Sequence, residues 1–397
     1  MSRWGHARCA VLTRARGSPI IDSNYQAMPG RRTFLPYIIT LLATVVARPY
    51  PNAAQDDRLE QLHRREGEAL IALADAALAG HQVPADLSLH WQNALLKAQQ
   101  GTFVPFVVTI DPVSPLPSAI LLYVRLVARQ SATRSEGPDT ARADIRPAPR
   151  PRRDDESIAP SAVESVYPID LRALPTGPIR VTRGFAARAG EYDLVVVARE
   201  RVDPLHPGAP RRAAALTKRL TLPDFGLTEL TTSSVILADR LTLLRAAPAS
   251  EQAEERPYLI GLSEIQPADD SVFRRDEELI VVFLVYNPFV TPEKKFDIEV
   301  EYHFFQKTGA RREGEQEIPG GLAERDGEQY FNRTKPQRFT PAIMGPQFDP
   351  TAGQPLMAGQ GVPLTAFPEG EYRLAIKVTD IVTGKSILRD VSFSVVS

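Results

Sequence analysis

The chain has 397 residues, of which 43% are hydrophobic and 24% charged, so it can build two or three domains with apolar cores. Its formal net charge of −1 gives no sign of a nucleic-acid partner, and its single cysteine, Cys9, excludes an intrachain disulfide framework and a cysteine-ligated metal site. The 35 prolines are about 9% of the residues, against about 5% in average proteins, which indicates short elements joined by many turns.

The N-terminal region has the features of an export signal. After Met28, Arg31-Arg32 precedes an apolar run over residues 34–47, and the small residues Ala53-Ala54 follow. A positive start, an apolar stretch and a small-residue exit are the three parts of a secretory signal peptide. The apolar run is shorter than the roughly 20 residues that span a bilayer, so we expect membrane contact only during export, and an uncleaved membrane anchor is the less favoured alternative.

Residues 1–54 are therefore expected to hold an upstream extension, residues 1–27, followed by the signal peptide. Residues 31–35 also match the twin-arginine export motif, and the general secretory (Sec) route is the alternative. Either route predicts a location in the periplasm or outside the cell. The mature protein is then expected to begin near Gln55.

Residues 55–100 are predicted to form a short helical N-terminal region. A helix capped at Asp56-Asp57 is expected to run to about Ala79, where Gly80 stops it. Residues 85–98 fit either a strand or a helix, because their first part alternates polar and apolar residues and their last part has a helical pattern.

Two runs rich in Val and Ile, residues 103–110 and 120–128, are predicted to open a first β-sandwich over residues 101–245. Residues 131–160 interrupt this sandwich with arginines and prolines. We expect this insertion to be disordered, because it has little apolar surface to bury. A basic tether for anionic lipid or cell-wall polymer is the alternative interpretation.

A second sandwich is predicted over residues 256–397. Eight apolar residues in succession, 279–286, indicate a central strand covered on both faces. Tyr372 begins an alternating strand after a Pro-Glu-Gly turn, and Tyr192 begins a similar strand in the first sandwich. Immunoglobulin-like sandwiches often carry a tyrosine corner at such a place. We therefore predict a mainly β protein with two immunoglobulin-like β-sandwich domains in tandem after the short helical region.

A family likeness adds to this prediction. Residues 220–225 read Leu-Thr-Leu-Pro-Asp-Phe, and residues 230–239 continue with Leu-Thr-Thr-Ser-Ser-Val-Ile-Leu-Ala-Asp. In this pattern, residues 165–240 resemble an accessory β-sandwich module of uncharacterised exported bacterial proteins related to the von Willebrand factor A domain. The resemblance implies an exported location. The family's adhesion domain is absent, since Asp269 and Ser271 stand without the second serine of its metal-binding motif, so no ligand site is implied.

No group of residues has the spacing of a known catalytic or metal site. The six histidines are scattered singly, and the sequence lacks a Gly-x-Ser-x-Gly nucleophile elbow. The acidic residues within 269–278 could gather around calcium, but they lack the spacing of a known calcium loop, and acidic turns beside a strand are the ordinary explanation. Glu299 and Glu301 are expected on a solvated strand face. The sequence thus predicts no cofactor, no metal and no catalytic residue.

The second sandwich is predicted to carry a long loop over residues 306–363. Loops vary without disturbing a core, and interfaces favour arginine and aromatic residues, so this loop is the predicted partner-binding segment. Its candidate binding residues are Arg311, Arg312, Tyr330, Phe331, Lys335 and Arg338. The alternative is that its aromatic residues only fasten the loop to its own sandwich.

These observations favour a non-catalytic protein of the bacterial envelope or periplasm, which acts as a binding or structural module on a protein or an envelope polymer. An enzyme or carbohydrate-binding protein acting on cell-surface polysaccharide is the alternative. A structure distinguishes them, because an enzyme needs convergent polar groups in a deep pocket, whereas a binding module presents an exposed apolar patch.

Overall fold

The structure is a computed structural model that describes residues 53–111, 114–115, 117–129, 161–172, 177–202, 210–246, 248, 255–309 and 319–397. The chain divides into two units, Met1–Arg65 and Glu66–Ser397. Helix α1 (Ala53–Leu78) begins in the first unit, and the described strands all lie in the second. The predicted signal peptide, apart from its last residues at the start of α1, and the insertion at 131–160 fall outside the described residues.

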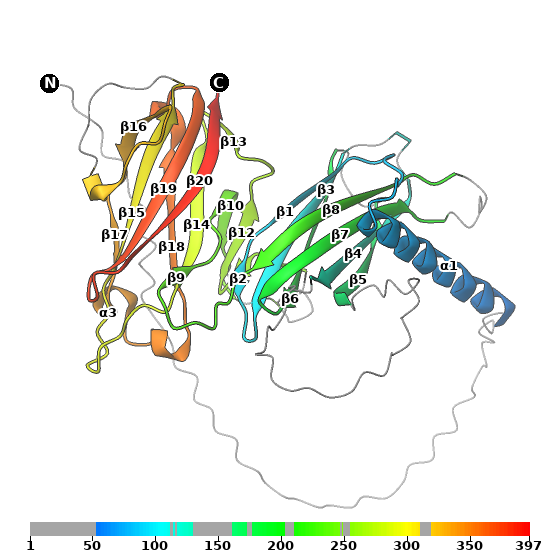
Figure 1. Cartoon of the computed structure of the whole chain (residues 1–397), viewed down its shortest axis with the longest axis horizontal. Helices are drawn as coiled ribbons and strands as arrows, with labels where there is room; N and C mark the ends of the chain where they lie inside the picture. The colour runs from blue at the N-terminus through cyan, green and yellow to red at the C-terminus, as the bar shows by residue number, and fades with distance from the viewer. Residues whose placement is uncertain are drawn as a thin grey trace, which may run out of the picture. The chain divides into compact units, whose positions relative to one another are not determined.

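Four β-sheets form the second unit (Figure 1), and the described strands are antiparallel except where β13 pairs with β20. Sheets A and B make the first sandwich. Sheet A contains, in spatial order, β5 (Ser161–Asp170), β4 (Ala119–Ala128), β7 (Gly190–Glu200) and β8 (Ala213–Leu222). Sheet B contains β3 (Thr102–Ile110), with β6 (Ile179–Ala187) along one edge and β1 (Leu89–Asn93) and β2 (Leu96–Lys97) along the other.

Sheets C and D make the second sandwich. Sheet C runs in the order β11 (Leu259–Ile260), β12 (Ser263–Pro267), β10 (Ile236–Leu243), β14 (Glu278–Tyr286) and β18 (Leu356–Pro363), with β9 (Thr231–Thr232) also paired to β14. Sheet D runs in the order β13 (Val272–Arg274), β20 (Ser386–Val396), β19 (Gly370–Asp380), β15 (Ile298–Lys307) and β16 (Glu328–Arg333), with β17 (Gln337–Phe339) also paired to β15.

The core of the first sandwich lies between sheets A and B. Alternate residues of β4, from Ile120 to Leu126, face alternate residues of β3, from Val104 to Ile110, and all of them are buried. The two apolar runs that were predicted to open this sandwich are therefore strands, but they lie in different sheets and face each other across the core. Both runs are almost continuously apolar because their other faces are buried too, Tyr123 of β4 against Leu70 of α1 and Val107 of β3 against Val282 of sheet C.

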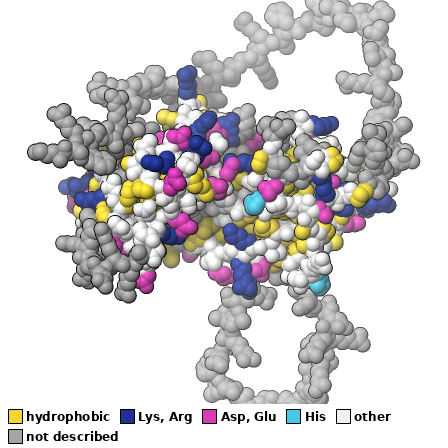
Figure 2. Space-filling view, turned by 90° about the horizontal axis from the view of Figure 1, so that it is seen from above, with side chains coloured by type: hydrophobic (Ala, Val, Ile, Leu, Met, Phe, Trp, Pro, Cys, Tyr) yellow, Lys and Arg dark blue, Asp and Glu magenta, His cyan; other side chains and the backbone are white. Residues whose placement is uncertain are grey.

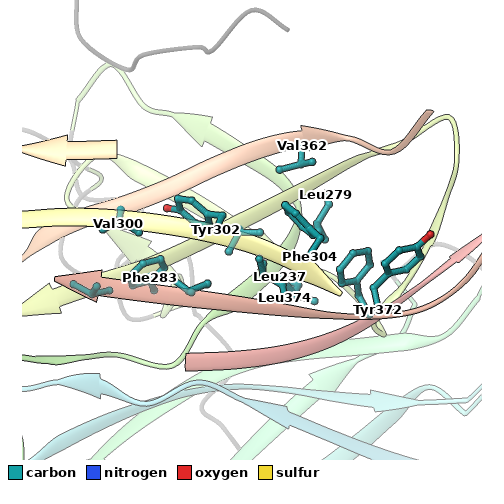
Figure 3. Close-up of a cluster of buried hydrophobic side chains, with 14 of the residues drawn as sticks. Leu237, Leu279, Phe283, Val300, Tyr302, Phe304, Val362, Tyr372 and Leu374 are labelled. Atoms are coloured by element: carbon teal, nitrogen blue, oxygen red, sulfur yellow. The ribbon is translucent and has the colours of Figure 1, made fainter. Parts of the chain in front are cut away.

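The core of the second sandwich lies between sheets C and D. Figure 3 shows Phe283 of β14 and Leu237 of β10 in this core together with Tyr302 and Phe304 of β15. The rings of Phe283 and Tyr302 meet edge to face, with their centroids 6.4 Å apart. Large buried rings remove much apolar area from water, so these contacts contribute strongly to the stability of this sandwich.

Sheets B and C pack back to back and join the two sandwiches. Ala94 and Val107 from the first sandwich lie in one apolar cluster with Ile236 and Val282 from the second. As its unbroken apolar sequence predicts, β14 is covered on both faces, since Val281 points into the core of the second sandwich and Val282 points at the first.

Several hydrogen bonds cross the same interface, and two of them involve tyrosine hydroxyls. The Tyr258 hydroxyl donates to the Pro105 carbonyl oxygen at 3.1 Å, and the Lys97 amide donates to the Tyr286 hydroxyl at 3.0 Å. Burial raises the pKa of Tyr286 to about 12, so its hydroxyl stays neutral at ordinary pH. The bonds give partners to polar groups that an apolar interface would otherwise leave unsatisfied.

The part of helix α1 that lies in the second unit, from Glu66 to Leu78, packs on the outer face of sheet A. Leu70 and Ala74 of the helix are buried against Tyr123 of β4 and Val195 of β7. The helix ends at Leu78, close to the predicted end. Two backbone bonds close its last turn, from the amide after Gly80 to the Ala76 carbonyl (2.8 Å) and from the Gly80 amide to the Ala77 carbonyl (3.1 Å), which is a Schellman motif.

The predicted domain boundaries are wrong at two places. Strands β1 and β2 lie in the region predicted as helical, and both pair with β3 of the first sandwich. Strands β9 and β10 lie in residues assigned to the first sandwich, but they pair with β14 of the second. The reason is that β10 is apolar on both faces, with Leu237 in its own core and Ile236 against the other sandwich, so its pattern does not reveal its sheet.

The region predicted as one long loop, residues 306–363, contains β16, β17, β18 and the short helix α3 (Pro341–Met344). The sequence suggested β16 and β17 as strand fragments but not β18, which pairs with β14 over its whole length. Gly359 weakens the strand signal of β18 and is nevertheless needed there. A Cβ at this position would lie 2.8 Å from the Val281 carbonyl oxygen.

Both predicted tyrosine corners are present. The Tyr372 hydroxyl donates to the Pro368 carbonyl oxygen at 2.7 Å, and the Tyr192 hydroxyl donates to the Arg188 carbonyl oxygen at 2.9 Å. The Tyr372 ring is fully buried and stacks on Phe393. The mainly β class and the two sandwiches are thus confirmed, while the immunoglobulin-like character stays a prediction.

Replacing Tyr372 with alanine should lower the free energy of unfolding by about 3–5 kcal/mol, because a large buried ring is lost. Tyr372→Phe should cost about 1–3 kcal/mol, because the Pro368 carbonyl loses its donor. Tyr192→Phe is the matched change in the first sandwich and should cost a similar amount. Chemical denaturation measures all three, and negligible losses throughout would show that the two corners do not stabilise the protein.

Candidate functional site

The aromatic residues of the predicted binding segment are packed within the second sandwich. Tyr330 and Phe331 are neighbours on β16 and therefore lie on opposite faces of sheet D. The Tyr330 ring contacts Phe305 at 5.5 Å between centroids, and the Phe331 ring contacts Phe367 at 4.8 Å and Tyr372 at 5.6 Å. Both rings fasten β16 to its own sandwich, which is the alternative that the sequence left open.

Of the basic residues of that segment, the structure describes Lys335 and Arg338. Arg338 is exposed and donates from Nε to Asp297 at 2.7 Å, and its second bond to the same carboxylate makes the pair bidentate. This pair holds the pKa of Asp297 below its usual range. Lys335 is exposed, and Arg311 and Arg312 lie outside the described residues.

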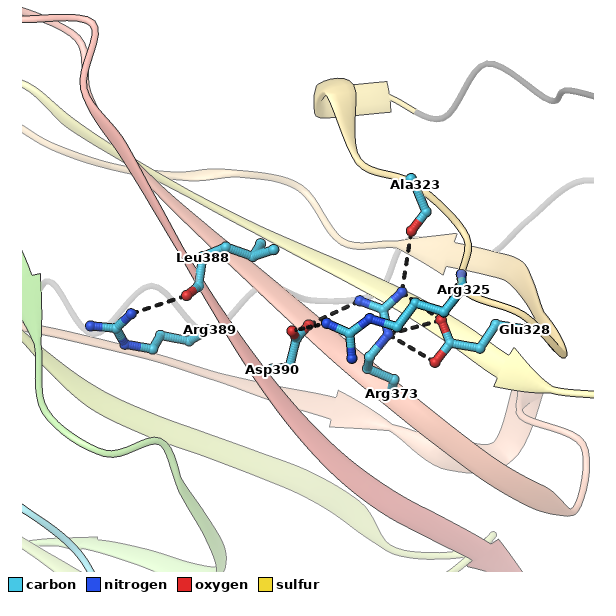
Figure 4. A network of polar contacts seen from close by, with 7 residues as sticks. All are labelled: Ala323, Arg325, Glu328, Arg373, Leu388, Arg389 and Asp390. Carbon is cyan, nitrogen blue, oxygen red and sulfur yellow. Dashed lines mark hydrogen bonds and ion pairs between the residues drawn. The ribbon is translucent and has the colours of Figure 1, made fainter. Parts of the chain in front are cut away.

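A dense group of charges covers the outer face of sheet D (Figure 4). Arg373 of β19 donates to Glu328 from Nε at 2.9 Å and from Nη2 at 2.6 Å, and to Asp390 from Nη1 at 2.9 Å. Its guanidinium carbon lies 4.1 Å from the centroid of the Phe305 ring. Arg325 also reaches Asp390, at 2.5 Å. These bonds hold residues 319–328, which we call the strap, against the outer face of the sheet.

The charges of this group stabilise the fold and are poorly suited to catalysis. Burial acts to raise the pKa of Glu328, but the hydrogen bonds and charge of Arg373 outweigh it and hold that pKa below its usual range. Because Glu328 stays ionised and Arg373 uses all its nitrogens, neither can easily exchange a proton or take a further ligand. On the face seen in Figure 2, basic and acidic side chains are intermixed.

His303 is buried under the strap, and neither ring nitrogen has a hydrogen-bond partner among the described residues. Burial lowers its pKa, while the Glu301 carboxylate, 3.6 Å from Nε2, acts to raise it. The ring is therefore neutral at ordinary pH. Sequence reasoning placed Glu301 on a solvated face, which is wrong: the strap covers it, its side chain is 13% exposed, and Lys377 donates to the Gly320 carbonyl above it.

The acidic residues within 269–278, which are candidate calcium ligands by sequence, take part in turns and ion pairs instead. Asp269 pairs with Arg180, Asp270 accepts the Val272 amide at 2.9 Å, and Asp276 pairs with Arg274. Within the described ranges, no group of three or more His, Cys, Asp or Glu side chains could hold a metal ion. None of the helices in the described part of the chain is long and apolar enough to cross a membrane.

A shallow hollow near the C-terminus is lined by Arg274, Arg275, Asp276, Thr365 and Ser397. Its arginines already have partners, because Arg274 pairs with Asp276 and Arg275 donates to the Thr365 carbonyl at 3.2 Å. The hollow lacks the enclosed, convergent polar groups of an active site.

A different surface stands out at the end of the second sandwich where β14 leads into β15 and β19 turns into β20 (Figure 1). The buried carboxylate of Asp380 accepts three backbone amides there, from Phe289 at 2.7 Å, Val382 at 3.0 Å and Thr383 at 3.1 Å. One carboxylate therefore fixes the loop after β14 and the turn after β19 side by side. The Ile381 amide adds a bond to the Asp297 carbonyl at 2.8 Å.

The side chains that these bonds hold outward are apolar. Phe289 is 49% exposed, Ile381 44% and Val382 43%, and we call these three residues the apolar tip. Sequence reasoning missed the tip. A signal was present, since turns usually carry Gly, Asn, Asp or Ser, whereas the turn after β19 carries an Ile-Val pair.

A third loop, residues 223–230, is joined to the same end. The Asn287 side chain donates to the carbonyl oxygens of Leu227 at 2.7 Å and Glu229 at 3.1 Å, and it accepts from Lys97 of the first sandwich at 3.2 Å. Asn287 has a positive φ of 56°, which asparagine tolerates better than most residues. The loops at this end are thus positioned by polar side chains rather than by the apolar core.

Comparison with known proteins does not identify a family, because no family model and no curated protein matches the chain. Among solved structures, a mutant of Salmonella alpha-2-macroglobulin matches with 13% identity and a TM-score of 0.19, over 79% of this chain and 17% of that one. A DUF4785 family protein from Legionella pneumophila matches with 8% identity and a TM-score of 0.21, over 77% and 56%. The chain thus spans less than two thirds of either protein, and likenesses this weak carry no argument.

Arg373→Met should lower the free energy of unfolding by about 3–5 kcal/mol, because it leaves Glu328 buried without its partner. Arg325→Met is the matched control, since Arg325 pairs with the same Asp390 but is exposed, and it should cost at most about 1 kcal/mol. Adding Glu328→Leu to Arg373→Met should restore most of the loss.

The same network should respond to acid. Because the folded-state pKa of Glu328 is depressed, its stabilisation is present above the ordinary glutamate pKa of about 4.3 and is lost as pH falls through the lower folded value. Urea denaturation of the wild type and of Glu328→Gln across this range measures the effect. Equal costs for Arg373→Met and Arg325→Met, or identical acid sensitivity in Glu328→Gln, would contradict the assignment.

Proposed function

We propose that this chain is an exported, non-catalytic protein of the bacterial envelope or periplasm that works as a binding module, with its contact surface at the loop end of the second sandwich. The observation that carries the proposal is the apolar tip. Three apolar side chains are exposed on loops whose backbones are fixed by the buried Asp380. Exposed apolar groups on a rigid support are typical of contact surfaces.

The partners of the arginine side chains support the same proposal. Arg373, Arg338 and Arg274 are bonded to carboxylates of their own chain, so these guanidinium groups act in holding the fold. The export signal predicted over residues 28–54 supports the location, and the likeness to exported bacterial proteins agrees with it. The partner-binding role first expected for residues 306–363 moves in this proposal to the neighbouring loop end, because the rings of Tyr330 and Phe331 are packed.

The proposal is tested by expressing the full chain in a bacterium, isolating the envelope and recovering the protein with whatever it binds after crosslinking. The tip variant combines Phe289→Gln, Ile381→Gln and Val382→Gln. The matched control combines Val166→Gln, Leu243→Gln and Val272→Gln, which are apolar residues elsewhere with equal or greater exposure.

Wild type and control should be recovered with the same crosslinked material from the envelope, and the mature N-terminus should lie near Gln55. The tip variant should remain folded, as judged by its unfolding midpoint, and should lose most of that material. Equal recovery by all three proteins, or a chain that retains Met1 in the cytoplasm, would contradict the proposal.

A further inference from the structure

The apolar tip is too small to be the core of a stable protein interface. A standard interface removes about 800 Å² of each partner from water, whereas a whole aromatic side chain supplies about 150–250 Å². Phe289, Ile381 and Val382 are each only about half exposed, so together they supply a fraction of that area. A lipid surface needs far less, because a few apolar side chains at a loop end can enter the headgroup region without a matching partner surface.

The charges around the tip fit an anionic surface. Lys294, Lys295 and Lys385 are exposed in the same two loops, and none of them forms an ion pair with a described carboxylate. Lysines beside apolar groups are the arrangement that favours anionic headgroups, since the ammonium groups reach the phosphates while the stems lie against apolar surface.

Most of the acidic groups in and beside these two loops are already bonded within the chain. Asp380 is buried beneath three backbone amides, and Asp297 is bound by Arg338. Asp349 caps its own turn by accepting the Thr351 amide at 2.9 Å, and the nearby charge of Lys294 helps to hold its pKa below its usual range. Glu293 is the exposed carboxylate of these two loops, against three exposed lysines, and the third loop at this end adds the exposed Asp224 and Glu229.

We infer that the apolar tip, with Lys294, Lys295 and Lys385 around it, docks on the surface of a bilayer that contains anionic phospholipids. This inference rests on the proposed binding function and names the partner of that surface. It goes beyond the expectation that the chain meets a membrane only during export. In this arrangement Asp380 is a positioning residue, because it holds the two loops together and does not itself touch lipid.

The test is co-sedimentation of the full chain with vesicles of phosphatidylglycerol and phosphatidylcholine, compared with vesicles of phosphatidylcholine alone. The tip variant and the exposed-residue control described above are measured beside the wild type. A lysine variant combines Lys294→Gln, Lys295→Gln and Lys385→Gln. Every protein carries the same apolar run at residues 34–47, so binding through that run would be common to all of them.

Wild type and control should bind the anionic vesicles, and the tip and lysine variants should each bind about tenfold or more weakly. The lysine variant should also lose the dependence on phosphatidylglycerol and on ionic strength. Folding of each variant is checked by its unfolding midpoint.

The inference is overturned if no vesicle is bound, if the tip variant binds as the wild type does, or if the control loses binding equally. Should the tip variant lose an envelope protein on crosslinking while no vesicle is bound, the occupant is a protein. In that case the inference fails and the proposed function stands.

Discussion

Successive side chains of β14 point alternately into two apolar regions. This burial of both faces constrains where the other sheets of the Glu66–Ser397 unit can lie. Val281 and Phe283 complete the core between sheets C and D, while Val282 and Leu284 meet residues of the first sandwich. A strand with no polar face cannot lie at a surface, so sheet B has to cover sheet C. The two sandwiches are therefore joined by apolar packing rather than by a linker alone.

This packing determines where a partner can bind. Sheet A is covered by α1, sheets B and C cover each other, and the strap covers part of the outer face of sheet D. Among the described residues, these contacts leave open the ends of the sheets and the rest of the outer face of sheet D. At one of these ends the buried Asp380 carboxylate fixes the backbone of loops with apolar side chains at the surface. Such an arrangement specifies geometry, which is expected of a binding surface.

Residue patterns predicted the features that depend on local alternation. The tyrosine corners at Tyr192 and Tyr372 and the central position of β14 follow from runs of apolar residues and neighbouring turns. Features set by distant contacts could not be predicted. Ile236 and Leu237 are apolar whichever sheet β10 joins, and the burial of His303 depends on a strap that folds back from residues 319–328. The sequence shows the Ile381-Val382 part of the apolar tip as an apolar turn. It does not show that Phe289 lies beside this turn, because the buried Asp380 brings the two loops together.

The first sandwich depends on β14 of the second for its stability, and the fluorescence of Trp91 measures that dependence. Trp91 lies in the first sandwich, stacked on Phe106, and Trp4→Phe would leave it as the only tryptophan. In that background, Val282→Asp places a charge in the interface and should lower the stability reported by Trp91 fluorescence in urea by about 3 kcal/mol or more. The exposed control Val272→Asp should change it by less than about 0.5 kcal/mol. A Trp91 transition that stays at its wild-type midpoint in Val282→Asp would contradict the account.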